Sequence, residues 1–112
     1  MNDATSIAGF QRTIEATYLE RDRRRGLAGT FVWFVEEVGE LARALKRGEP
    51  KNLREEFGDV LAWLSTLASL AGVDLAEAAS SYGGGCPSCA GIPCRCPMKD
   101  TPVGPFASPA GS

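Results

Sequence analysis

The sequence contains the same short acidic pattern twice: residues 36–40 read Glu-Glu-Val-Gly-Glu, and residues 55–59 read Glu-Glu-Phe-Gly-Asp. Within each pattern, two acids three positions apart fall on one face of a helix. If the two helices pack together, four carboxylates converge, and any two that are about 5 Å apart repel by roughly 3 kcal/mol at an effective dielectric constant of about 20. Bound cations would relieve this repulsion, and carboxylate oxygens favour Mg²⁺ or Mn²⁺. The pattern therefore predicts a magnesium site and phosphate chemistry. The four predicted ligands, which would also be the catalytic residues, are Glu37, Glu40, Glu56 and Asp59.

The alternative is that these acids form a solvated helix face, as most such pairs do. Two features favour the metal site. Trp33 and Trp63 continue the two acidic lines, and tryptophan is not typical of a solvent face. Gly39 and Gly58 occupy the same place in each copy, and a glycine inside a helix costs roughly 1 kcal/mol relative to alanine. Their recurrence predicts a close approach of the two helix backbones.

Helical periodicity runs through most of the chain, and no strand signal of any length interrupts it. Gly26 and Gly29 mark a first break, Gly48 a second and Gly72 a third, while Pro50 suits the first turn of a helix. The predicted helices cover about residues 6–24, 30–46, 50–71 and 74–82.

Two further patterns refine this picture. Asn52 with Glu55, and Asp74 with Glu77, resemble capping boxes at the starts of the third and fourth helices. Residues 60–71 are apolar nearly all round, which predicts burial on two sides. A bundle this small could hardly bury them alone, so we expect an all-α, four-helix bundle that is completed by assembly into a homodimer or homotetramer. The core stripes of the second and third helices are Phe31, Phe34, Val35, Val38, Leu41, Ala42 and Leu45, and Leu53, Phe57, Val60, Leu61, Leu64, Leu67 and Ala68.

Composition excludes several classes of function. The 112 residues suffice for one small domain, and a net charge of −2 with a pI near 5.1 does not indicate binding to a nucleic acid polymer. The chain has no histidine, which excludes Ser-His-Asp and Cys-His nucleophilic sites and HExxH zinc hydrolases. Residues 1–10 lack the features of a signal peptide, and no apolar stretch is long enough to span a bilayer. A cytoplasmic protein without membrane contact is expected.

All four cysteines lie in one short segment after Gly83-Gly84-Gly85. In a cytosolic protein, clustered thiols indicate a metal site more strongly than they indicate disulfides. The preferred interpretation is a structural zinc site similar to a zinc knuckle. Redox cysteines or a loosely ordered tail are the alternatives. The expected organisation is a helical catalytic domain over residues 1–82, a Cys-rich appendage over 83–97 and a disordered tail over 98–112. The predicted zinc ligands are Cys86, Cys89, Cys94 and Cys96.

The doubled acidic pattern resembles the Glu-x-x-Glu…Glu-x-x-Asp signature of MazG-type nucleotide pyrophosphohydrolases. The resemblance covers about residues 5–82 and extends to Thr30-Phe31-Val32-Trp33 before the first pair and Val60-Leu61-Ala62-Trp63 after the second. It implies an all-α fold, two or more Mg²⁺ ions held by the four acids, and cleavage of nucleoside triphosphates to monophosphate and pyrophosphate. It also implies dimers or dimers of dimers. One of the four acids, or Glu36 or Glu55, would orient the attacking water.

Many relatives in this family carry Lys and Asn or Arg beyond the fourth helix that reach the phosphates, whereas this chain has Ser80-Ser81-Tyr82-Gly83 there. Trp33 and Trp63 are candidates for stacking on the base, with core or interface packing as the alternative. The basic candidates for the phosphates are Lys46, Lys51 and Arg54, or the cluster at residues 21–25. The leading hypothesis is an enzyme that removes unwanted nucleotides. The alternatives are a non-catalytic oligomeric module with a zinc tail and a regulator that senses nucleotides.

Overall fold

The first helix, α1 (Ile7–Arg47), begins where Ser6 caps it, with the Ser6 side chain accepting a 3.0 Å hydrogen bond from the Gly9 amide. The computed structural model describes residues 6–98. Inside α1, Gly26 has φ 83° and ψ 167°, a conformation that only glycine adopts readily. Gly26 therefore divides α1 into a first arm (7–25) and a second arm (27–47). The predicted break at Gly26 is confirmed, while Gly29 lies inside the second arm.

The turn between α1 and the second helix, α2 (Pro50–Leu70), is made by Gly48 and Glu49. Gly48 has φ 71°, and its amide donates to the Ala44 carbonyl at 2.9 Å. The Glu49 carboxylate caps α2 by accepting from the amides of Asn52 at 2.7 Å and Lys51 at 3.2 Å. The predicted capping box at Asn52 and Glu55 is therefore wrong, because the helix begins one turn earlier, at Pro50, and Asn52 already lies within it.

The helical region ends with α3 (Leu75–Ala79) and a single 3-10 turn, η1 (Ser80–Tyr82). Gly72, with φ 75°, follows the end of α2, as predicted. The Asp74 side chain accepts a 3.2 Å hydrogen bond from the Glu77 amide and caps α3, as its pattern predicts. The described residues contain no strand, and the all-α class is confirmed.

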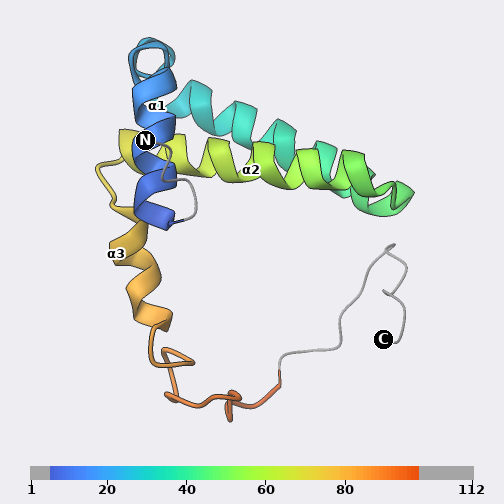
Figure 1. The fold of residues 1–112 in the computed structure, drawn as a ribbon, viewed down its shortest axis with the longest axis vertical. Helices are drawn as coiled ribbons and strands as arrows, with labels where there is room; N and C mark the ends of the chain where they lie inside the picture. Colours follow the sequence, from blue (N-terminus) through green and yellow to red (C-terminus); the bar gives the residue numbers. More distant parts are fainter. Residues whose placement is uncertain (1–5, 99–112) are drawn as a thin grey trace.

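Figure 1 shows the second arm of α1 and α2 lying side by side, while the first arm of α1 crosses α2 near its C-terminal end. A buried glutamine fixes this crossing. The amide nitrogen of Gln11 donates to the Ser69 hydroxyl at 3.1 Å and to the Val73 carbonyl at 2.9 Å, and its amide oxygen accepts from the Leu75 amide at 2.9 Å. One polar side chain thus holds the start of α1 against the junction of α2 and α3.

The core within one chain is small. Its buried apolar side chains are Ile14, Ala44 and Ala68, whereas Phe31 and Phe57 are 54% and 53% exposed. The predicted core stripes of the two long helices therefore remain largely open within a single chain. Other stripe residues that are exposed are Val35, Val38, Leu45, Leu61 and Leu64.

The expected close approach of helix backbones at Gly39 and Gly58 is wrong within the described chain. A Cβ atom added at either glycine would meet no atom within 4 Å. Both glycines therefore border open space, although they flank the acidic residues in matching positions.

Among residues 6–98, no single helix is both long and apolar enough to cross a membrane, and one sharply bent pair, Pro50–Leu70 with Leu75–Tyr82, meets that test of length and composition. The Cys-rich segment follows η1 and leads away from the α1–α2 pair (Figure 1). Of the predicted tail, 98–112, only Met98 falls within the described residues.

Candidate metal centre and adjoining cavity

Three of the four predicted metal ligands come together between α1 and α2. Carboxylate oxygens of Glu37, from the second arm of α1, and of Glu56 and Asp59, from α2, all lie within 4.8 Å of one another. We call these three residues the acidic cluster. The fourth predicted ligand, Glu40, lies one helical turn beyond Glu37, and its carboxylate pairs with Arg43 at 2.8 Å instead.

The electrostatics of the acidic cluster fit a divalent cation. Burial, followed by the negative charges of Asp59 and Glu56 and then of Glu40 and Glu36, raises the pKa of the Glu37 carboxyl. One oxygen of Glu56, Oε1, is buried and has no hydrogen-bond partner among the described residues. A buried carboxylate oxygen without a donor is costly, and a hard cation would satisfy it. The donor set and this unpaired oxygen together match the oxygen ligands that Mg²⁺ or Mn²⁺ prefers.

A cavity of about 270 Å³ adjoins the acidic cluster and shares Asp59 with it. Two arginines from the first arm of α1 lie on its wall, and the indole of Trp63 forms another part. The cavity therefore places cationic and aromatic groups beside a carboxylate of the predicted metal site. Its lining residues are Tyr18, Arg21, Asp22, Arg25, Asp59, Ala62, Trp63 and Thr66.

A buried hydrogen-bond network forms one wall of this cavity. Asp22 is only 4% exposed, and its carboxylate accepts from the Thr66 hydroxyl at 3.0 Å and pairs with Arg25 at 3.0 Å. Arg25 also donates to the hydroxyl of buried Thr30 at 3.3 Å. The network ties the first arm of α1 to α2 and orients the Arg25 guanidinium. No sequence signal separated Asp22 from the surrounding run of charged residues, so this residue was missed.

The two tryptophans that were predicted to lie near the acids stack on each other. Their ring centroids are 6.2 Å apart, and the ring planes are inclined by 18°. The Arg25 guanidinium lies over the Trp63 ring at 4.9 Å from its centroid. Trp63 is thus covered by Trp33 and Arg25 and faces the cavity as well, while Trp33 is 53% exposed.

The other basic candidates lie elsewhere. Lys46 is in the last turn of α1, and Lys51 is in the first turn of α2. These two residues and Arg54 are exposed, and none of the three lines the cavity. Of the alternatives that the sequence offered, the cluster at residues 21–25 is the one that the fold brings to the cavity, through Arg21 and Arg25.

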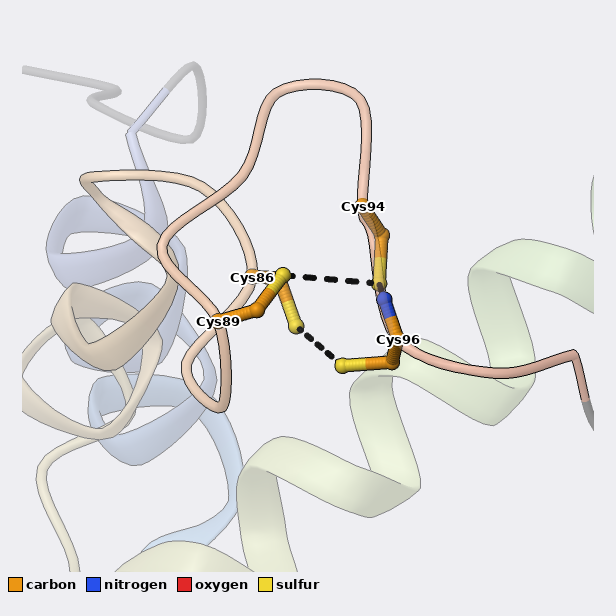
Figure 2. A group of neighbouring side chains, drawn as sticks. All are labelled: Cys86, Cys89, Cys94 and Cys96. Atoms are coloured by element: carbon orange, nitrogen blue, oxygen red, sulfur yellow. Dashed lines mark hydrogen bonds between the residues drawn. The ribbon is translucent and has the colours of Figure 1, made fainter.

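A second cluster of metal-binding side chains lies beyond η1. The sulfur atoms of Cys86, Cys89, Cys94 and Cys96 all lie within 4.8 Å of one another, and Figure 2 shows them pointing toward one another from two stretches of the loop. The backbone amides of Arg95 and then Gly91 lower the pKa of the Cys89 thiol to about 6. This sulfur cluster shares no residue with the acidic cluster or the cavity.

Comparison with known families assigns the helical region. The model of the MazG nucleotide pyrophosphohydrolase domain matches residues 27–82, which is half of the chain. The protein therefore belongs to the MazG nucleotide pyrophosphohydrolase family, and the resemblance stated from the sequence is confirmed. No curated protein matches the chain. The matched range contains the acidic cluster and both tryptophans, whereas the first arm of α1 and the sulfur cluster lie outside it.

Proposed function

We propose that this protein is a Mg²⁺-dependent nucleoside triphosphate pyrophosphohydrolase that releases nucleoside monophosphate and pyrophosphate. The observation that carries the proposal is the position of the acidic cluster against a cavity lined by Arg21, Arg25 and Trp63. Family membership supports the reaction class. The activity would suit removal of unwanted nucleotides from the cellular pool.

Glu37, Glu56 and Asp59 would hold the metal, since their oxygens already lie close together. Glu40 would join them by leaving Arg43. That pair is solvent-exposed, and exposed ion pairs contribute less than about 1 kcal/mol, so the exchange costs little. When bound, Mg²⁺ polarises phosphoryl oxygens and neutralises charge on a leaving pyrophosphate.

Arg21 and Arg25 are the residues that we expect to contact the phosphates. Guanidinium groups bind phosphate through paired hydrogen bonds, and the Asp22 network holds Arg25 at the cavity wall before substrate enters. The base would lie against the exposed part of the tryptophan pair, where an aromatic face is available. Lys46, Lys51 and Arg54 would contribute only at the margin of the site, because they do not line the cavity.

The direct test is a panel of ribo- and deoxyribonucleoside triphosphates incubated with the pure protein and Mg²⁺. We expect equal amounts of monophosphate and pyrophosphate from the preferred nucleotide, and no turnover in excess EDTA. Diphosphate with orthophosphate as the products would contradict the proposal, as would full activity in EDTA. Asp59→Asn serves as the inactive control, since Asp59 belongs to both the acidic cluster and the cavity.

A non-catalytic oligomeric module is the second candidate, and the open apolar faces of α1 and α2 favour it. A regulator that senses nucleotides is the third candidate, in which the cavity binds a nucleotide without cleaving it. The same nucleotide panel, measured by calorimetry as well as by pyrophosphate release, separates the three candidates. Nucleotide binding without pyrophosphate release would identify a sensor, and the absence of both would favour the module.

A further inference from the structure

We propose that the sulfur cluster of Cys86, Cys89, Cys94 and Cys96 is a closed structural zinc site that binds one Zn²⁺ per chain through four thiolates, separate from the Mg²⁺ site. The observation that points to it is the spacing of the four sulfur atoms, which are free thiols that lie at the distances a tetrahedral metal requires.

The sulfur–sulfur distances match a ZnS₄ tetrahedron. With Zn–S bonds of about 2.3 Å, the edge of a regular tetrahedron is about 3.8 Å. The Cys86 and Cys96 sulfurs are 3.8 Å apart, as are those of Cys89 and Cys94 (Figure 2). A disulfide bond would bring two sulfurs to about 2.05 Å, so the arrangement is that of metal ligands and not of disulfide partners.

Backbone amides of the same loop point at these sulfurs. The Cys89 sulfur accepts from the amides of Gly91 at 3.4 Å and Arg95 at 3.3 Å, and the Cys94 sulfur accepts from the Cys96 amide at 3.3 Å. Such donors stabilise thiolate charge and fix the direction of these two ligands. A ZnS₄ centre carries a formal charge of −2, and the Arg95 side chain folds back over the loop to donate to the Cys89 carbonyl at 3.3 Å.

The loop is shaped tightly around the cluster. The Cys86 amide donates to the Gly91 carbonyl at 3.1 Å, and the Cys86 carbonyl accepts from the Ala90 amide at 2.7 Å. A Cβ atom at Gly91 would lie 2.7 Å from the Pro93 carbonyl oxygen and 3.2 Å from the Cys89 sulfur. At Gly85, which has φ 107°, a Cβ atom would lie 2.8 Å from the Gly91 oxygen. These positions require glycine because the chain closes on itself around the four sulfurs.

Little else in the loop could hold this shape. Ile92 is 79% exposed and Met98 is 94% exposed, so the segment buries almost no large apolar side chain. A metal that crosslinks four positions supplies the free energy that a core would otherwise provide.

Four protein ligands leave no open coordination position for substrate or water, which marks the site as structural. The donor atoms also determine which metal each site prefers, because the thiolates of the sulfur cluster select zinc and the carboxylates of the acidic cluster select magnesium.

The test uses the full-length reduced protein and needs no nucleotide. Metal analysis of the purified protein should give one zinc per chain. After removal of zinc with a chelator, Co²⁺ should bind with the absorption of a tetrahedral thiolate complex and be displaced by one equivalent of Zn²⁺. Cys86→Ser with Cys89→Ser should abolish the Co²⁺ thiolate bands, while Ser88→Ala, a change between the same two ligands, should retain them.

Circular dichroism of the double variant should show that the helices remain, so that loss of metal is not loss of fold. The proposal is overturned if the reduced protein takes up no Co²⁺, if the purified protein contains iron in place of zinc, or if the double variant keeps the thiolate bands. Because the readout is spectroscopic, failure of the zinc site would leave the proposed hydrolysis untouched, and failure of hydrolysis would leave the zinc site untouched.

Discussion

Thr66 of α2 donates a 3.0 Å hydrogen bond to Asp22 of α1, and both side chains are buried. This contact joins elements that are distant in sequence and places a negative charge in the interior, where Arg25 is its ion-pair partner. Removal of one partner of a buried pair leaves an uncompensated charge. The pair is therefore part of what holds the first arm of α1 against α2, and it also orients a cavity arginine.

Arg25→Ala should lower the free energy of unfolding by about 3 kcal/mol, because Asp22 would lose its ion-pair partner. Arg24→Ala is the matched control, since Arg24 pairs with Glu20 on the exposed surface and should cost less than about 1 kcal/mol. Urea denaturation of both variants measures the difference. Equal losses would mean that the Asp22–Arg25 pair contributes no more than a surface ion pair.

Features that depend on local backbone conformation could be predicted from the sequence, whereas features that depend on contacts between distant residues could not. Gly26, Gly48 and Gly72 marked helix ends correctly, because backbone conformation is a local property that glycine reports directly. The capping box at Asn52 failed because Glu49, one turn earlier, caps α2 and accepts from the Asn52 amide, the donor that Glu55 would have used. Asp22 was missed because its burial depends on Thr66, far away in the chain, and its own neighbours are charged.

The acidic cluster shows the same division. Its spacing placed Glu37 and Glu56 on facing helices, and the fold brings their oxygens together with that of Asp59. Periodicity could not show that Glu40 pairs with Arg43, since both partners lie on one helix and either could turn toward solvent or toward α2. The arginines of the cavity wall were one alternative among several, because only the turn at Gly26 brings the first arm of α1 to α2.

Asp59→Asn and Glu56→Gln should each reduce hydrolysis by at least about 100-fold, since even loss of a group that only supports a metal ligand costs about 10- to 100-fold. Circular dichroism should show unchanged helicity. Mg²⁺ should raise the Tm of the unmodified protein by more than that of either variant, because the cation binds the folded state more weakly after the substitution. Identical Mg²⁺ stabilisation of all three proteins would remove these residues from the metal site.

Glu37→Gln, at the third residue of the acidic cluster, should change how stability depends on pH. The raised pKa of Glu37 favours its protonated form in the folded, metal-free protein. The protonated Glu37 side chain therefore makes its full contribution to stability at pH values below its ordinary pKa of 4.5. This contribution is lost as the pH rises through the higher pKa of the folded state. In EDTA, the Tm advantage of Glu37→Gln over the unmodified protein should grow with pH across this window, and Mg²⁺ should reduce the advantage. An advantage that does not change with pH would contradict the electrostatic account of the cluster.

Gly39→Ala and Gly58→Ala should each stabilise the isolated chain by about 0.5–1 kcal/mol, because alanine favours the helix and the added Cβ atom meets nothing within 4 Å. Gly26→Ala is the contrasting control, as its backbone conformation costs a non-glycine residue about 1–3 kcal/mol. Thermal unfolding of the three variants shows whether each substitution raises or lowers stability. Destabilisation at Gly39 and Gly58 would indicate that another chain packs against these glycines in solution.

The open apolar faces of α1 and α2 predict a homodimer or homotetramer with a large buried interface. Light scattering at micromolar concentration should give a mass of two or four chains. Phe31→Glu and Phe57→Glu should shift the distribution toward monomer, because both rings are about half exposed in one chain. Thr13→Glu, at an exposed and uncharged helical position, is the control matched for one added negative charge. A stable and active monomer would contradict assembly through these faces.

A chain that ends at Tyr82 should retain its helices and hydrolysis while losing its zinc. The acidic cluster and the cavity are complete by Thr66, the family match ends at residue 82, and the sulfur cluster shares no residue with either site. Pyrophosphate release, zinc content and light scattering of the shortened and full chains provide the comparison. Ser88→Ala in the full chain controls for a change in the loop that leaves all four sulfurs in place. If shortening abolished turnover while the oligomer stayed intact, the segment after η1 would have to reach the active site, and the two metal sites would be functionally linked.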